Sequence, residues 1–206
     1  MNRFADPPYL VAITPGDHNR GRDLNTWLLE MAAAGLRAVI IREPHLEGPE
    51  LDALVMSAWG SIPVVAVHER SAHARDFGLP VHLKADSDRR APLSLWSQSC
   101  HSATEVDAAF KAGAWWTLLS PVWRPNSKPD DTRPPLGIDA FCAIAAGRPV
   151  LALGGVNTKR LRALRERGAW GAAVMGSIFD QPDPLTAARA TEALLEVCSL
   201  VKLPPP

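Results

Sequence analysis

Short apolar runs alternate with amphipathic segments along nearly the whole chain. The apolar runs have the length of buried strands, and the segments between them repeat apolar residues at helical spacing. The runs that predict strands are Tyr9–Thr14, Arg37–Glu43, Ile62–Glu69, Leu79–Ala85, Leu93–Ser99, Ala114–Pro121, Arg148–Gly155 and Ala169–Gly176. Strands that alternate with helices form parallel sheets with right-handed crossovers. Eight such units predict an α/β fold, a compact single-domain (β/α)8 TIM barrel.

The segments between these runs carry helix signals. Asp23 and Ser102 stand where N-caps are favoured, and Pro49 stands in a first turn. The predicted helices are 23–35, 48–60, 70–78, 102–113, 137–147, 157–168 and 183–201. The alternative is an open doubly wound sheet, which favours a GxGxxG turn after its first strand. The sequence "ITPGDHNRG" at that position lacks this motif, which favours the barrel.

Composition fits one globular domain over residues 1–206, with a core from about residue 9 to 200 and a tail at 201–206. The chain is 47% apolar and has a formal net charge of zero, which argues against nucleic acid or an anionic membrane as a partner. No apolar run has the length of a membrane span, and the N-terminus lacks the apolar core of a secretory signal. Cys100, Cys142 and Cys198 form no CxxC pair. We therefore expect a cytoplasmic protein with reduced thiols and no structural zinc.

Glycines follow the last two predicted strands. Gly154 and Gly155 end "LALGG", and Gly176 and Ser177 follow "AVM". In barrels of this kind a phosphate site recurs at the loops after strands seven and eight, because glycine lets backbone N–H groups approach an anion. These residues therefore predict a phosphate site, although glycines of this kind also serve as simple tight turns.

Two further side chains stand at strand ends. Arg42 ends an apolar run, where its guanidinium must meet an anion or a carboxylate such as Glu43. His101 lies between two small residues, where a neutral imidazole can move protons near pH 7. For both, a structural role remains the alternative.

Several other polar or aromatic residues favour structural roles. The spacing of His68 and His73 does not suit a helical metal pair, and His82 lies within a strand pattern, so we expect it to be buried and hydrogen-bonded. One of Trp115 and Trp116 is expected to pack in the barrel wall. The segment "KRLRALRER" is expected to be the solvated face of a helix.

A proline-rich loop, "SPVWRPNSKPDDTRPPLG", runs from Ser120 to Gly137 and contains Lys128 near its middle. Loops of this length in compact domains are usually functional or disordered. Together with "SQSCHSATEVDAAFKAGAWW", "PVLALGGV" and "GAAVMGSIF", this loop resembles the thiamine-phosphate synthase superfamily, which includes the TenI-type thiazole tautomerases. The resemblance spans about Tyr9 to Phe179.

The resemblance implies a phosphorylated thiazole as ligand. It implies that the loop after strand six closes over the thiazole phosphate, with Ser127 and Lys128 as its hydroxyl–lysine pair. It implies an acid/base role for His101 in the tautomerase branch. Arg42, Gly154, Gly155, Gly176 and Ser177 complete the expected substrate site. No protein partner is implied, and a homo-oligomer stays open.

The sequence departs from the synthase pattern in several places. The QLREK motif corresponds to Ile40–Pro44 here, and the asparagine–aspartate pair corresponds to His68 and Glu69. A metal-binding aspartate falls near Ser87, with Asp86 and Asp88 beside it. We therefore expect no cofactor, and Mg²⁺ held by Glu69, Asp86 and Asp88 only if the chain is a synthase.

These departures favour a thiazole tautomerase, which needs neither diphosphate nor metal. The first alternative is thiamine-phosphate synthase, a Mg²⁺-dependent transferase that joins hydroxymethylpyrimidine diphosphate to thiazole phosphate. The second alternative is a non-catalytic binder or regulator that keeps only the phosphate site.

Overall fold

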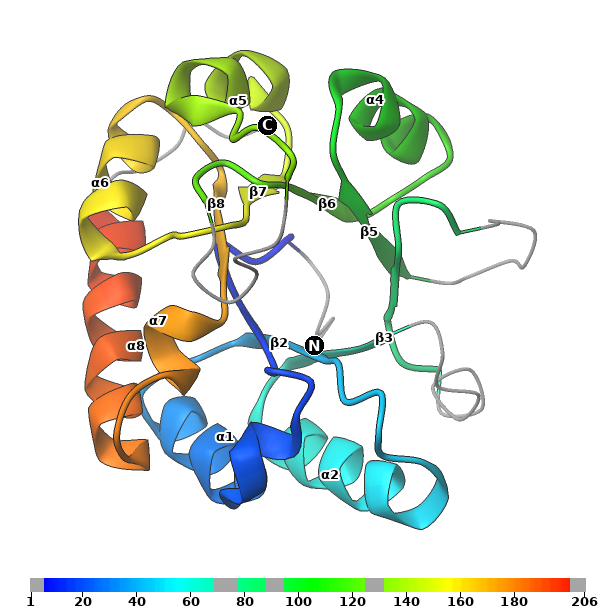
Figure 1. The fold of residues 1–206 in the computed structure, drawn as a ribbon, viewed down its shortest axis with the longest axis vertical. Helices are drawn as coiled ribbons and strands as arrows, with labels where there is room; N and C mark the ends of the chain where they lie inside the picture. The colour runs from blue at the N-terminus through cyan, green and yellow to red at the C-terminus, as the bar shows by residue number, and fades with distance from the viewer. Residues whose placement is uncertain (1–5, 69–77, 88–94, 125–131, 201–206) are drawn as a thin grey trace.

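The computed structural model describes residues 6–68, 78–87, 95–124 and 132–200, and these form a closed barrel of parallel strands (Figure 1). Strand β1 pairs with both β2 and β8, which closes the sheet. The strands are β1 (Leu10–Ile13), β2 (Ala38–Ile41), β3 (Val64–His68), β4 (Val81–Leu83), β5 (Trp96–Cys100), β6 (Trp116–Leu119), β7 (Val150–Ala152) and β8 (Gly171–Val174). The predicted (β/α)8 barrel is confirmed, and the open-sheet alternative is wrong.

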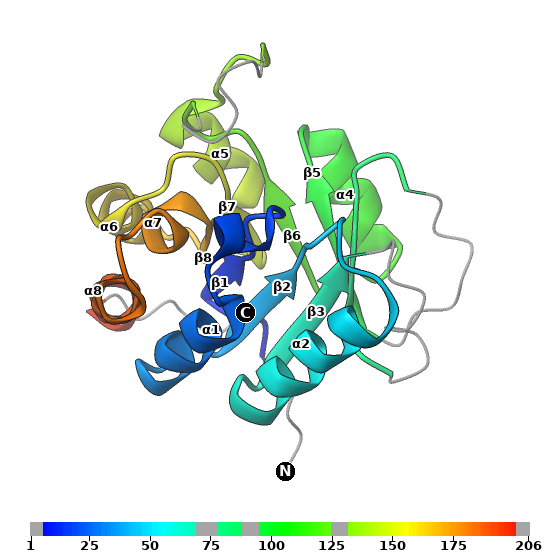
Figure 2. The same ribbon diagram turned by 60° about the horizontal axis from the view of Figure 1, so that its bottom comes forward.

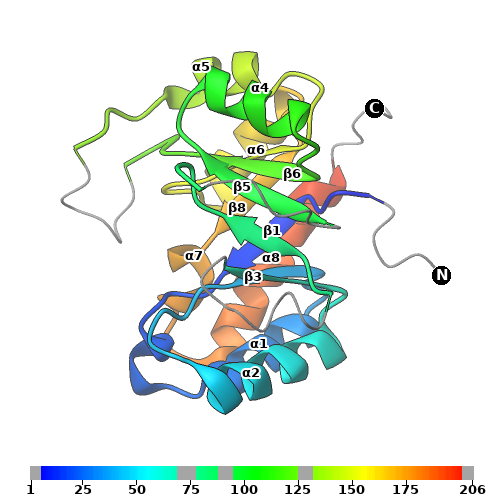
Figure 3. The ribbon, with the colours of Figure 1, turned by 90° about the vertical axis from the view of Figure 1, so that its right-hand side faces the viewer.

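Helices surround the strands. They are η1 (His18–Gly21), α1 (Leu24–Ala33), α2 (Gly48–Ser61), α4 (Ala103–Lys111), α5 (Gly137–Ala145), α6 (Thr158–Glu166), α7 (Gly176–Phe179) and α8 (Pro184–Leu200). Figure 2 shows α1 and α2 side by side against β2 and β3. Figure 3 shows α4 and α5 on one flank of the barrel and α1 and α2 on the opposite flank. No helix in the described ranges combines the length and apolar character that crossing a membrane requires.

Side-chain oxygens cap the N-termini of several of these helices. Asp23 accepts a hydrogen bond from the N–H of Asn25, and Ser102 accepts one from the N–H of Glu105. Both predicted N-caps are confirmed, and Pro49 lies in the first turn of α2 as expected. The Asn157 side chain caps α6 in the same way. Each cap satisfies a backbone donor that has no partner within its helix.

Alternate residues of several strands, such as β1, face two separate apolar clusters. Leu10 and Ala12 pack in the cluster between strands and helices, whereas Val11 and Ile13 pack in the second cluster inside the barrel. This follows from the two-residue period of a strand. Trp116 is fully buried in the inner cluster, as expected for one of the two tryptophans.

One prediction about the helices needs correction. Arg165, within the segment expected to be solvated, is only 2% exposed. Its guanidinium donates to the carbonyl oxygens of Ala169, Trp170 and Cys198. The short elements η1 and α7 were not predicted, because four residues are too few to show helical periodicity. The predicted helix 70–78 lies almost entirely outside the described residues.

Candidate functional site

The turn after β7 has a backbone that only glycine adopts without strain. Gly154 has a φ of 101° and Gly155 a φ of 63°, both in the left-handed region. A Cβ on Gly154 would lie 2.8 Å from the carbonyl oxygen of Trp123, and one on Gly155 would lie 3.0 Å from that of Arg124. The two glycines are therefore required by both conformation and space.

The turn after β8 lies beside this one. Strands β7 and β8 pair in register at Ala152 and Ala172. The hydroxyl of Ser177 donates to the carbonyl oxygen of Val156, which ties the two loops together. We call the residues Gly154, Gly155, Gly176 and Ser177 the glycine cradle.

The glycine cradle has the chemistry of an anion site. Among the backbone–backbone hydrogen bonds that join the described turns, loops and helix ends, none is donated by the N–H of Gly155, Gly176 or Ser177. Helix α6 also begins just beyond Gly155, at Thr158. Backbone N–H groups gathered near a helix N-terminus favour a phosphate. The structure thus brings together all four residues predicted for this role, while phosphate binding itself stays a prediction.

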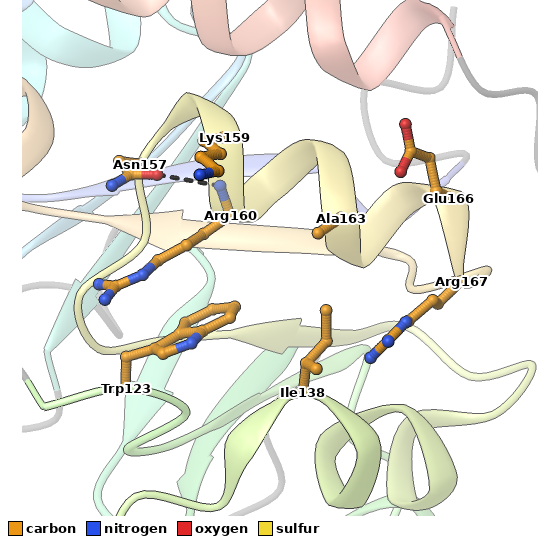
Figure 4. Close-up of a pocket in the computed structure, with 8 residues that line it drawn as sticks. All are labelled: Trp123, Ile138, Asn157, Lys159, Arg160, Ala163, Glu166 and Arg167. Atoms are coloured by element: carbon orange, nitrogen blue, oxygen red, sulfur yellow. Dashed lines mark hydrogen bonds between the residues drawn. The ribbon is translucent and has the colours of Figure 1, made fainter.

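Two arginines donate hydrogen bonds to backbone carbonyl oxygens around the glycine cradle. Arg22 donates to the carbonyl oxygens of Phe179 and Gln181, at the end of α7. Arg160 donates to the carbonyl oxygen of Gly155 at 2.5 Å, and its guanidinium lies 5.1 Å from the centre of the Trp123 ring (Figure 4). These bonds fix carbonyl groups on both loops, so the geometry of the cradle is set before any ligand arrives.

A cavity of about 590 Å³ lies between α5 and α6 and borders the Gly155 turn through Arg160 (Figure 4). It is lined by Trp123, Ile138, Asn157, Lys159, Arg160, Ala163, Glu166 and Arg167. The cavity lies on the outer flank of the barrel, whereas the chemistry of (β/α)8 barrels gathers at the C-terminal ends of the strands. We therefore place the candidate site at the strand ends.

A reciprocal helix cap holds the backbone of His101. Ser102 accepts from the N–H of Glu105, and the Glu105 carboxylate accepts from the N–H of His101 at 2.8 Å. This arrangement is a variant of the capping box, which the sequence "SATE" encodes. It fixes the position of His101 directly after β5.

The imidazole of His101 contacts residues of the loop between β6 and α5. Its Nδ1 atom lies 2.9 Å from the carbonyl oxygen of Ser120 and 3.3 Å from the Ser120 hydroxyl. One guanidinium nitrogen of Arg133 lies 2.6 Å from Nδ1 and 2.7 Å from Nε2. His101 is half-buried, as a group that exchanges protons with a ligand must be. Its catalytic role stays a prediction.

Arg42 and Glu43 lie at the end of β2. The N–H of Arg42 donates to the Thr14 hydroxyl, and its guanidinium lies 3.4 Å from the carbonyl oxygen of Pro15. The buried carboxylate of Glu43 accepts from the N–H of Gly16 at 3.0 Å. Glu43 therefore helps to hold the loop after β1, and anion binding by Arg42 stays a prediction.

His82 is buried inside the barrel, as expected. Its two ring nitrogens lie 2.8 Å from the Ser97 hydroxyl and 2.9 Å from the Ser99 hydroxyl. Burial lowers the pKa of His82 to about 3, and the charge of nearby His68 contributes in the same direction. The ring is therefore neutral near pH 7, and hydroxyl groups satisfy both of its nitrogens.

The predicted metal residues are only partly described. Asp86 is exposed after β4, whereas Glu69 and Asp88 lie outside the described residues, as do Ser127 and Lys128. Within the ranges that the structure covers, no group of three or more His, Cys, Asp or Glu side chains could hold a metal ion. Mg²⁺ binding by Glu69, Asp86 and Asp88 therefore stays a prediction.

Sequence reasoning missed Ser120, Arg133 and Arg160. Each acts through a partner that is distant in sequence or bonds to a backbone atom, and no periodic pattern marks such contacts. The only available signal was the position of Arg133 directly before Pro134 and Pro135, within the loop already suspected of function.

Sequence comparisons with known proteins identify one family. The sequence profile described as thiamine monophosphate synthase matches residues 80–178. The chain is 32% identical to a thiamine-phosphate synthase of Acidothermus cellulolyticus over 196 residues, covering 85% of this chain and 90% of that protein. It is 27% identical to one of Chloroflexus aurantiacus, covering 91% and 93%.

Solved structures share the fold. A thiamine phosphate pyrophosphorylase from Pyrococcus furiosus superimposes with a TM-score of 0.77 at 21% identity, covering 93% of this chain and 96% of that one. At this identity the likeness supports the barrel alone.

Proposed function

The chain belongs to the thiamine-phosphate synthase/TenI family, and from this membership we propose that it binds a thiazole phosphate and acts in thiamine biosynthesis. The reaction we propose first is that of a thiamine-phosphate synthase, because the similar proteins of known name carry that activity in their names. This replaces the tautomerase as the leading interpretation of the sequence.

The observation that carries the proposal is the glycine cradle. Its two turns follow neighbouring strands and are tied by the bond from Ser177 to Val156. The N–H groups of Gly155, Gly176 and Ser177 donate none of the backbone hydrogen bonds that join the described turns and loops. Backbone N–H groups would donate hydrogen bonds to a phosphate held there, and the positive end of the α6 dipole would stabilise its negative charge. The thiazole ring would then extend across the strand ends toward β5 and β6.

The proposed reaction is a substitution at the pyrimidine methylene carbon. The thiazole nitrogen forms a C–N bond with this carbon while the C–O bond to diphosphate breaks, and diphosphate leaves with the bonding electrons. Bound Mg²⁺ would neutralise charge on the leaving diphosphate. Of the residues that would hold this ion, Glu69, Asp86 and Asp88, only Asp86 is among the described residues, and we assign no step to the ion. The contribution of this chain is to hold the thiazole by its phosphate and so orient its nitrogen.

His101 favours a second candidate, the thiazole tautomerase. This reaction removes a proton from one position of the ring system and returns it at another, which one positioned imidazole can do. The Ser120 carbonyl orients the His101 ring, as such a role requires. Ile40 and Pro44 also stand where the synthase motif has glutamine and lysine, which weakens the diphosphate half of the site.

One pair of assays separates the candidates. The purified protein is incubated with thiazole phosphate, hydroxymethylpyrimidine diphosphate and Mg²⁺, and separately with the non-aromatic thiazole carboxylate phosphate in EDTA. We expect thiamine phosphate in the first assay, and its loss when EDTA replaces Mg²⁺. Aromatic thiazole formed in EDTA, without thiamine phosphate in the first assay, would establish the tautomerase instead. Turnover in neither assay, with thiazole phosphate still bound, would indicate a non-catalytic binder.

A further inference from the structure

The guanidinium of Arg133 lies against the ring of His101. The two residues are 32 positions apart, and one terminal nitrogen of Arg133 is within 2.7 Å of both ring nitrogens. Arg133 is half-buried, on the returning end of the loop between β6 and α5. It therefore stands at the strand ends where the barrel carries its candidate chemistry.

The backbone around Arg133 is fixed on its C-terminal side. Pro134 and Pro135 follow it directly, so their φ angles are set and Arg133 itself is restricted to extended conformations. Leu136 then donates its N–H to the carbonyl oxygen of Pro121 at 2.9 Å. The returning end of the loop is thus tied to its start, next to Ser120.

The contacts also define the state of the His101 ring. A guanidinium can only donate hydrogen bonds, and a carbonyl oxygen can only accept them. With Nδ1–H donating to the Ser120 carbonyl, the lone pair of the neutral ring lies on Nε2. The Arg133 nitrogen is nearly equidistant from Nδ1 and Nε2, so the guanidinium lies against the ring and not along the lone pair of one nitrogen. The contact therefore places the positive charge of Arg133 beside His101.

We propose that Arg133 is a specificity residue that binds a second anionic group of the substrates beside His101. The inference rests on the proposed function, in which the thiazole phosphate occupies the glycine cradle. The cradle follows β7 and β8, whereas His101, the residue that Arg133 contacts, follows β5, which β6 separates from β7. The anion beside His101 is therefore proposed as a second group. A guanidinium presents a planar fork of donors that matches a carboxylate or a phosphate oxygen pair.

Two groups of the proposed substrates have this chemistry. One is the ring carboxylate of the tautomerase substrate, and the other is the diphosphate of the pyrimidine substrate. Binding either anion would draw the guanidinium of Arg133 away from the ring of His101. Substrate binding would then both pair the guanidinium with an anion and leave the His101 ring in contact with the substrate.

Calorimetry on three variants tests the proposal. Arg133→Met removes the charge, Arg133→Lys keeps the charge without the fork, and Arg162→Met removes an exposed arginine of α6 as the matched control. The probes are thiazole phosphate, the same compound with a ring carboxylate, and inorganic diphosphate. Binding of plain thiazole phosphate by the parent protein tests the proposed function separately.

We expect Arg133→Met to lower the affinity for one of the two additional anions by roughly 10- to 100-fold. Arg133→Lys should lower this affinity by less, and Arg162→Met should leave it unchanged. Loss confined to the carboxylate compound identifies the carboxylate as the group bound, and loss confined to diphosphate identifies the diphosphate. Unchanged affinity for both, or failure of the parent to bind either, would overturn the proposal. An equal loss for plain thiazole phosphate would also overturn it, because Arg133 would then serve the first phosphate.

Discussion

Nδ1 of His101 lies 2.9 Å from the carbonyl oxygen of Ser120, the residue that directly follows β6. Since a carbonyl only accepts hydrogen bonds, this contact places a proton on Nδ1 and leaves Nε2 to exchange protons with a ligand. The ring is thus oriented by the backbone of a neighbouring strand end.

The first prediction concerns proton transfer by His101. The amide of Asn in His101→Asn can still donate to the Ser120 carbonyl, but it cannot carry a proton at neutral pH. On the non-aromatic thiazole carboxylate phosphate, we expect turnover to fall by about 10²- to 10⁴-fold. Affinity for thiazole phosphate should change little, because the glycine cradle holds the phosphate. Steady-state kinetics and calorimetry on the same preparation check both statements.

A purely structural role for His101 predicts the opposite pattern. The variant would then melt at a lower temperature and keep normal turnover in its folded fraction. Thermal unfolding of His101→Asn beside the parent protein provides this control.

The second prediction concerns stability in acid. His82 has a pKa of about 3 in the folded protein and about 6.5 when unfolded. The unfolded chain therefore binds a proton between these values that the folded chain does not. The contribution of His82 to stability is complete above pH 6.5 and is lost as the pH falls toward 3, at about 1.4 kcal/mol per pH unit.

Urea unfolding at several pH values checks this contribution. The free energy of unfolding of His82→Gln should fall less steeply with acid than that of the parent protein. His45→Gln, which changes an exposed histidine, should keep the parent slope. Identical slopes for His82→Gln and the parent would show that the buried ring does not set the acid sensitivity.

The third prediction concerns the buried arginine of α6. Arg165 donates to the carbonyl oxygens of Ala169, Trp170 and Cys198, and so ties α6 to β8 and α8. Arg165→Met leaves these buried carbonyls without their donor, and we expect a loss of about 2–4 kcal/mol in the free energy of unfolding. Arg162→Met, on the exposed side of the same helix, should change it by less than about 0.5 kcal/mol. Similar losses in both variants, measured by urea unfolding, would contradict the structural role of Arg165.

The barrel was predictable because its signals are local and repeated. Each strand gives an apolar run, and each cap needs only a side chain such as Asp23 or Ser102 near its own helix. The glycine cradle was predictable for a related reason, since fold and strand order alone place the two turns side by side.

The environment of His101 was not predictable in the same way. Its partners Ser120 and Arg133 lie 19 and 32 positions away, and one bond goes to a backbone carbonyl. The burial of Arg165 was missed because its partners are also carbonyl groups, which leave no mark in the sequence. From the sequence alone, a basic helical segment is therefore predicted to be exposed to solvent.

The most direct test of the account is the affinity of thiazole phosphate for Gly155→Ala, measured by calorimetry beside Gly147→Ala. Both glycines have positive φ, 63° and 70°, so both variants incur a backbone strain of about 1–2 kcal/mol. A Cβ at Gly147 meets no atom within 4 Å, whereas one at Gly155 lies 2.9 Å from Arg160 and 3.0 Å from the Arg124 carbonyl. We predict that Gly155→Ala binds thiazole phosphate at least about 10-fold more weakly than Gly147→Ala. Equal affinities would show that the phosphate does not bind at the glycine cradle and would contradict the central claim.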